Sequence, residues 1–211
     1  MKLRRNNLEL YSNLLIPDVE NKGVVTTKPV VINNYTIEKL KTRYIAFDTE
    51  TTGLNPSRDR IIELGAVLFE NGKCVKRFQS LVNPGVFISA RVTAVNNITN
   101  SMIKNAPTEE VVYSELAEFL KDAYNEQTII CAHNARFDMN FLSETLMRLG
   151  YNANINYIDT LTFAKQKIKG LYNYKQDTVA HYFDIVNEQA HRAASDAETC
   201  GKILWNLIEE K

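Results

Sequence analysis

Four acidic residues and one histidine, carried by three separate segments, are the residues of this chain best suited to chemistry. The first segment, YIAFDTETTGL (44–54), holds two carboxylates two residues apart; the second, AHNARFDMNFL (132–142), holds an aspartate. The third, HRAASDAET (191–199), holds a histidine and a further aspartate. Four carboxylates with a nearby base can bind two divalent metal ions and activate water against a phosphodiester. These five candidates are Asp48, Glu50, Asp138, His191 and Asp196.

The pair in the first segment lies at the end of an expected strand. Side chains two residues apart point to the same face of a strand, so Asp48 and Glu50 are neighbours. Adjacent carboxylates repel each other, and a cation between them relieves that repulsion. Oxygen ligands favour Mg²⁺ or Mn²⁺ over zinc. Acids are also common at exposed strand ends, so this pair alone does not decide for a metal site.

The other candidates each have a structural alternative as well. Asp138 lies on an expected helix next to Phe137, where a carboxylate is either solvated or balanced by a cation. Asp196 falls near a helix start, where its charge also suits the helix dipole. His191 precedes it on a loop, and an ordinary histidine pKa suits a general base near neutral pH. His133, at the end of a strand beside the site, is a candidate supporting residue.

The elements that must position these residues follow an α/β pattern. An antiparallel hairpin with a tight turn at Asn71-Gly72 comes first, and strands then alternate with helices. The sequence therefore predicts a mixed sheet, with an antiparallel hairpin plus parallel strands, flanked by helices. The expected strands span 44–48, 61–70, 74–82, 128–132 and 156–159, and the expected helices begin at 107 and 135 and lie near 160–168, 174–183 and 194–209.

The N-terminal part differs in character from the rest. Residues 1–42 lack a sustained apolar period and are expected to form a basic arm or extension, with the domain at 43–211. Up to residue 43 the chain holds 8 Lys and Arg against 4 Asp and Glu, and the remainder holds 17 against 21. A protein that grips long duplex through phosphates is expected to be basic. We therefore expect a short nucleic-acid end, with metals supplying positive charge. The extension is a partner tether, a nucleic-acid contact or a packed segment.

Composition limits the cellular setting. Apolar runs are too short for a signal peptide or a membrane span, so no membrane partner is expected. The three cysteines, Cys74, Cys131 and Cys200, have no CxxC spacing. They favour a reducing, cytoplasmic location.

In this order and spacing the three segments resemble the exonuclease motifs of the DEDD superfamily, in its histidine-containing DEDDh branch. The resemblance covers about residues 43–209 and is strongest to the proofreading exonucleases of bacterial replicative polymerases, either the epsilon subunit or the domain within the Gram-positive enzyme. It implies a ribonuclease H-like fold and removal of nucleotides from a 3′ end. One departure is VNNIT (95–99), where relatives often have glycine; Asn97 can adopt the same left-handed turn.

The resemblance also implies a role for each motif residue. Asp48 would bridge two metal ions, Mg²⁺ with Mn²⁺ able to substitute, and Glu50, Asp138 and Asp196 would complete the ligand set. His191 would take the proton of the attacking water. The residues implied to contact the substrate are Thr51, Thr52, Leu54, His133, Asn134 and Phe137.

Three functions remain open from the sequence. The first is a metal-dependent 3′–5′ exonuclease that releases nucleoside 5′-monophosphates from single-stranded or frayed DNA ends, in proofreading or repair. The second is the same chemistry on RNA ends, and the third is a non-catalytic nucleic-acid-binding module. DNA is favoured over RNA, a DNA polymerase subunit is a candidate partner, and the oligomeric state is open.

Overall fold

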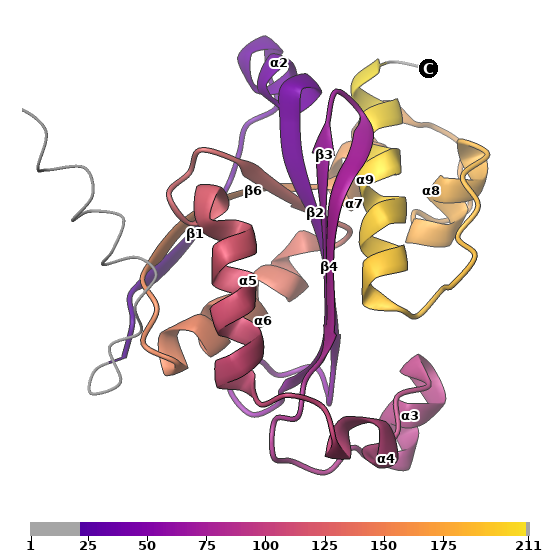
Figure 1. Cartoon of the computed structure of the whole chain (residues 1–211). Helices are drawn as coiled ribbons and strands as arrows, with labels where there is room; N and C mark the ends of the chain where they lie inside the picture. Colours follow the sequence, from indigo (N-terminus) through magenta and orange to yellow (C-terminus); the bar gives the residue numbers. More distant parts are fainter. Residues whose placement is uncertain (1–21, 210–211) are drawn as a thin grey trace, which may run out of the picture.

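A mixed six-stranded sheet with helices on both faces forms the centre of the molecule (Figure 1). The computed structural model describes residues 22–209 of the chain. Within that range the strand order is β1-β6-β5-β2-β3-β4. The strands are β1 (Val25–Pro29), β2 (Arg43–Thr51), β3 (Ile61–Glu70), β4 (Lys73–Leu81), β5 (Ile129–Ala132) and β6 (Ala153–Asp159). The helices are α2 (Asn34–Thr42), α3 (Ala90–Asn96), α4 (Asn100–Lys104), α5 (Glu109–Tyr124), α6 (Ala135–Arg148), α7 (Thr160–Lys167), α8 (Gln176–Tyr182) and α9 (Ala193–Glu209).

The sheet combines two kinds of pairing, as predicted. Strands β2, β3 and β4 pair antiparallel, and Asn71 and Gly72 both take positive φ in the tight turn between β3 and β4. Strands β2, β5, β6 and β1 run parallel to one another. Both faces of the parallel part are covered, which explains why β2 and β5 are almost continuously buried. The carboxyl ends of the four parallel strands consequently meet at one edge of the sheet.

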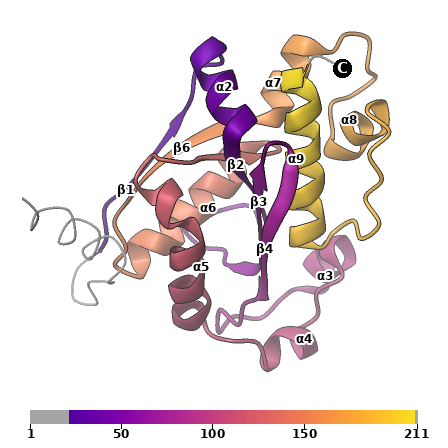
Figure 2. The ribbon, with the colours of Figure 1, turned by 45° about the horizontal axis from the view of Figure 1, so that its top comes forward.

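Each face of the sheet has its own hydrophobic core. Helices α5 and α6 cover one face, where Phe47 packs with Leu116 and Leu142. Helix α9, with α2, α7 and α8, covers the other, where Tyr44 stacks on Phe69. Figure 2 shows α9 lying along the sheet on the side opposite α5. The central strand β2 is therefore fixed from both faces.

Residues 22–42, the described part of the predicted N-terminal extension, pack onto the sheet. Strand β1 pairs in parallel with β6 from Val25 opposite Ala153 to Pro29 opposite Tyr157. Helix α2 follows, and its Leu40 is fully buried in the core beneath α9. The described part of the predicted extension is thus packed onto the domain. Residues 1–21 of that extension lie outside the described residues.

No helix within residues 22–209 has both the length and the apolar character that a membrane span requires.

Replacement of Gly65 by alanine should destabilise the fold. Gly65 lies opposite Asp48 in the sheet, and an added Cβ would lie 2.1 Å from the carbonyl carbon of Ala193 at the start of α9. Because backbone atoms cannot yield as a side chain can, we expect a loss of about 1–3 kcal/mol in the free energy of unfolding, measured with urea. Gly85→Ala is the matched control: no atom lies within 4 Å of the added Cβ, so only its positive φ should contribute, at about 1–2 kcal/mol, and the loss at Gly65 should be the larger of the two. Equal losses in the free energy of unfolding for the two variants would contradict the claim that Gly65 is required for the close contact with Ala193.

Candidate active site

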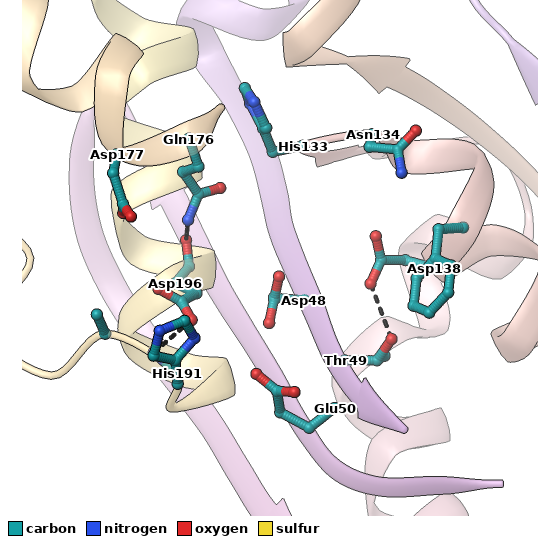
Figure 3. Close-up of a pocket in the computed structure, with 12 residues that line it drawn as sticks. Asp48, Thr49, Glu50, His133, Asn134, Asp138, Gln176, Asp177, His191 and Asp196 are labelled. Carbon is teal, nitrogen blue, oxygen red and sulfur yellow. Dashed lines mark hydrogen bonds between the residues drawn. The ribbon is translucent and has the colours of Figure 1, made fainter. Parts of the chain in front are cut away.

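A pocket of about 270 Å³ opens at the carboxyl ends of β2 and β5, between α6 and α9 (Figure 3). Its lining draws on all three sequence segments, although they are up to 148 positions apart between Asp48 and Asp196. The structure therefore brings the predicted catalytic set to one place. The predicted residues that line it are Asp48, Glu50, Asp138, His191, Asp196, His133, Asn134 and Phe137.

Strand β2 supplies the centre of the pocket. Figure 3 shows the Asp48 carboxylate between Asp196 and His191 on one side and Asp138 on the other. The intervening Thr49 points the opposite way, and its hydroxyl donates a 2.8 Å hydrogen bond to Oδ1 of Asp138. This bond ties β2 to α6 and fixes the Asp138 side chain at the pocket.

Three carboxyl groups of the pocket, those of Asp48, Glu50 and Asp138, resist ionisation. Burial, then the neighbouring charges of Asp138 and Asp196, raise the pKa of Asp48 well above its ordinary value. Burial raises the pKa of Glu50 to about 7, and Asp196 and Glu63 add to the effect. Burial also raises the pKa of Asp138 to about 7, against the opposing effect of the Thr49 hydrogen bond. Groups placed this way gain strongly from a cation that neutralises them.

Glu50, His191 and Asp196 form the tightest group of metal-ligand atoms in the pocket. Their ligand atoms lie within 4.8 Å of one another. Asp196 is oriented by two donors, the side-chain amide of Asn187 at 2.5 Å and the backbone N–H of His191 at 3.0 Å. Asp48 and Asp138 line the same pocket outside this group. Carboxylate oxygens with raised pKa values and one imidazole fit a hard divalent cation such as Mg²⁺ or Mn²⁺.

The backbone at His191 is held by an ion pair between a fully buried glutamate and a partly exposed arginine, which the sequence did not predict. His191 takes a left-handed φ of 66°, and the next residue, Arg192, binds the carboxylate of Glu63 at 2.7 Å and 3.0 Å. Glu63 is fully buried on β3 and also accepts bonds from Gln79 and from the N–H of Ala193. The pair fixes the end of the His191 loop to the sheet. The sequence did hold one sign of this ion pair: a glutamate inside the apolar run IIELGAVLFE (61–70) is expected to need a partner when the strand is buried.

Two further residues around the site were also missed. Asn96, buried at the end of α3, forms a side-chain hydrogen bond with Glu50 that opposes the rise in the pKa of that carboxyl. Asn97 then ends the helix at φ 59°, so the expected left-handed turn is confirmed. Gln176 lines the pocket and donates to the backbone oxygen of Asp196 at 3.0 Å. Amide side chains carry little pattern in the sequence, which is why they were not found.

The residues implied to hold the terminal nucleotide lie at the end of β2 and in the turn that follows it, outside the lining of the pocket. The Thr51 hydroxyl donates to the carbonyl of Gly53 at 2.6 Å, and the Thr52 hydroxyl accepts from the N–H of Arg60 at 2.9 Å. Leu54 projects from this closed turn with 85% of its surface exposed. The turn is thus well ordered by its own hydrogen bonds and presents an apolar tip.

His133 forms part of the pocket wall through a fixed ring. Nδ1 lies 2.9 Å from the hydroxyl of Thr160, and Nε2 lies 2.8 Å from the carbonyl oxygen of Tyr174. Burial lowers the pKa of this histidine, which favours the neutral ring. The following residue, Asn134, takes a left-handed φ of 66° and is the N-cap of α6. Both ring nitrogens of His133 are engaged, so its role is to support the wall.

Comparison with known proteins gives a consistent set of similarities. A family model described as RNase_T, exonuclease, matches residues 45–204. The DNA polymerase III PolC-type of Caldanaerobacter subterraneus subsp. tengcongensis is 37% identical over 171 residues, 81% of this chain and 12% of that protein. Its counterpart from Halalkalibacterium halodurans is 34% identical over 197 residues, 93% of this chain and 13% of that protein. The chain thus spans about an eighth of the length of these relatives.

Solved structures with a similar fold are also exonucleases. Exonuclease X in complex with 5′ overhanging duplex DNA superposes with a TM-score of 0.61 at 24% identity, over 81% of this chain and 92% of that chain. E. coli exonuclease I in complex with a dT13 oligonucleotide superposes with a TM-score of 0.68 at 16% identity, over 81% and 41%. At these identities the likeness concerns the fold.

Removal of the Arg192 side chain should leave a buried charge without its partner. Arg192→Ala should lower the free energy of unfolding by about 3 kcal/mol, near the lower end for such pairs because the arginine is 40% exposed. Arg77→Ala is the matched control, since its partner Glu198 is nearer the surface and the pair should contribute below about 1 kcal/mol. Urea unfolding of both variants tests this, and a loss at Arg192 no larger than at Arg77 would refute the anchoring role.

Proposed function

The chain belongs to the RNase_T exonuclease family, and from that premise we propose that it hydrolyses single-stranded or frayed DNA from the 3′ end and releases nucleoside 5′-monophosphates. The observation that carries the proposal is the pocket in which Asp48, Glu50, Asp138 and Asp196 converge with His191. Burial raises the pKa values of all four acids, and repulsion from its neighbours adds to the effect at Asp48 and Glu50, which supports a role in binding cations.

In this mechanism the four carboxylates would hold two divalent cations, with Asp48 central to the set of ligands. When bound, the cations would lower the pKa of the attacking water and stabilise negative charge on the reacting phosphate. Thr49 keeps Asp138 oriented through its 2.8 Å hydrogen bond. Asn187 and the His191 N–H orient Asp196 in the same way. The side chains are therefore arranged before the substrate binds, which keeps the cost of reorganisation small.

His191 acts as the general base. Its side chain is exposed at the mouth of the pocket, while its backbone is held by Asp196 and by the neighbouring Glu63–Arg192 pair. An imidazole nitrogen of His191 takes the proton from the attacking water and later passes it to solvent. The anchored backbone with an exposed ring suits a group that must meet water at a fixed position.

The substrate is a 3′ terminus with unpaired bases. The exposed Leu54 supports this choice, because an apolar tip beside the pocket can insert between the last two bases, with Thr51 and Thr52 behind it. His133, Asn134 and Phe137 form the opposite wall. The PolC-type relatives are DNA polymerases, which supports DNA over RNA. We accordingly propose a proofreading role beside a polymerase, in the cytoplasm, where the three free cysteines stay reduced.

Two labelled oligomers, one of DNA and one of RNA, test the proposal. With Mg²⁺ the chain should shorten the DNA oligomer stepwise from its 3′ end, and EDTA should stop the reaction. Asp48→Asn and Asp138→Asn should reduce the rate by roughly 10³-fold or more, because each removes a charge that the cations require. Circular dichroism of both variants controls for folding. A faster ladder from RNA would make the RNA alternative correct, and no cleavage of either oligomer would refute the proposal.

His191→Ala separates the base from the metal ligands. This variant should lose about 10²–10⁴-fold in rate, while calorimetry shows Mg²⁺ binding close to that of the unaltered chain. A large loss of Mg²⁺ affinity would make His191 a ligand, as its place beside Glu50 and Asp196 also permits.

Without metal, the stability of the chain should fall as pH rises. Glu50 and Asp138 have pKa values of about 7 when folded, above their ordinary values of 4.5 and 3.8. Between about pH 4 and pH 7 the folded state therefore holds more protons than the unfolded state, so the free energy of unfolding decreases with pH and then levels off. Urea unfolding in EDTA from pH 5 to pH 8 measures this. Mg²⁺ should make the free energy of unfolding depend less on pH. A free energy of unfolding that rises with pH in EDTA would contradict the raised pKa values of Glu50 and Asp138.

A further inference from the structure

We propose that a second groove, at the carboxyl ends of β1 and β6, binds the stretch of a single DNA strand that lies 5′ of the nucleotide being removed. The inference rests on the proposed function, because the strand must have its 3′ end in the pocket around Asp48. The groove has a volume of about 470 Å³ and lies between α6 and α7. Val30, Val31, Arg136, Tyr157, Asp159 and Thr162 are the lining residues that matter here.

The groove lies on the same edge of the sheet as the active site. In the strand order β1-β6-β5-β2, the catalytic pocket sits at β5 and β2 and the groove at β1 and β6. Helix α6 leaves β5 toward one face of the sheet, whereas α7 leaves β6 toward the other. Ligands of open α/β sheets bind in the crevice that such a divergence creates. Figure 1 shows β1 and β6 away from the β3–β4 hairpin, on the other side of β2.

The pocket and the groove share a wall. Asp159, which lines the groove, accepts a 2.9 Å hydrogen bond from the N–H of Asn134, which lines the pocket. Their centres are two strand spacings apart, roughly 10 Å at about 4.8 Å per strand. That separation corresponds to roughly three stacked nucleotides at about 3.4 Å each. A strand anchored by its 3′ end can therefore continue directly into the groove.

Charge in the groove favours a phosphate. Arg136 is exposed, and it forms no hydrogen bond or ion pair with any residue between 22 and 209. The carboxylate oxygens of the groove, those of Asp159, are already engaged: they accept from the N–H groups of Asn134, Ala135 and Leu161 and from the Thr162 hydroxyl, and none of these bonds involves Arg136. Arg136 is thus the free charge of the groove, and a guanidinium suits a phosphate oxygen.

The other wall of the groove is apolar and suits bases. Val31 is 75% exposed on the segment after β1, with Val30 beside it, and Tyr157 is half-buried on β6. Aromatic and apolar side chains next to a cation are the usual means of holding a single strand without reading its sequence. This combination favours an unpaired DNA strand over a protein segment as the occupant.

This assignment gives the N-terminal extension a role. Val30 and Val31 lie before residue 43, outside the segments that carry the catalytic motifs. The 2.8 Å hydrogen bond from the N–H of Val30 to the carbonyl of Tyr157 fixes this segment onto the sheet. The extension thereby lengthens the binding surface for the strand.

Steady-state kinetics on the full chain, with substrates of increasing length, test the groove. The p-nitrophenyl ester of thymidine 5′-monophosphate reaches only the catalytic pocket, whereas oligomers of two, four and eight nucleotides extend progressively toward β1. Arg136→Ala should raise KM for the octamer roughly tenfold relative to KM for the ester. Arg136→Glu should raise it further, and Val31→Glu should act in the same direction. The difference should appear between the dimer and the octamer, and kcat should change little.

Salt dependence and a matched control complete the experiment. Loss of one phosphate contact should reduce the slope of log affinity against log salt by about 0.7 for Arg136→Ala on the octamer. Lys73→Ala and Lys73→Glu make the same charge changes at the far end of the β3–β4 hairpin and should leave all KM values unchanged. If Arg136→Ala leaves KM for the octamer unchanged, or raises KM for the ester and the octamer equally, the proposal that this groove binds the strand is wrong. Failure of the unaltered chain to cleave any substrate would instead refute the proposed function.

Discussion

Repulsion among the carboxylates around Asp48 is the constraint to which the rest of the structure responds. The four acids come together from β2, α6 and α9 and are costly to keep charged without a cation, because burial and then the charges of its neighbours raise the pKa of Asp48 well above its ordinary value. The fold offsets this by placing β2 at the centre of the sheet with a hydrophobic core on each face. Apolar burial of that extent outweighs a few unfavourable charges. The acids can therefore be held close together before any metal binds.

Helix α9 has to approach the sheet closely for Asp196 to reach this cluster. Gly65 permits the approach, because a side chain there would collide with the backbone of Ala193. The ion pair between Glu63 and Arg192 then fixes the start of α9 beside β3, the strand that carries both Glu63 and Gly65. A buried ion pair contributes little net stability compared with apolar packing, but it sets position well. In this fold, position is what the proposed catalytic residues next to the pair require.

The sequence predicted the catalytic half of the fold better than the supporting half. The motif-bearing elements β2, α6 and α9 follow clear apolar periods, and the ribonuclease H-like mixed sheet is confirmed. Strand β1 escaped prediction because it is an edge strand with an exposed, polar sequence, VTTKP. Helices α3 and α4 are too short to show a period. Glu63 and Asn96 act through contacts across the sheet, which local sequence does not encode.

Exposed apolar side chains on both sides of the pocket suggest how the molecule uses its remaining surface. Leu54 follows β2 and Val31 follows β1, and they are 85% and 75% exposed. Neither side chain contributes to a core, and both are exposed to water. Contact with a ligand that removes this apolar surface from water would therefore be favourable. Both residues follow the carboxyl ends of their strands. The pocket that holds the carboxylates opens at the same edge of the sheet, at the ends of β2 and β5. A strand that lay along this edge would cover both residues while its reacting phosphate met the acids. Binding energy from remote nucleotides would then help to hold the scissile bond in place.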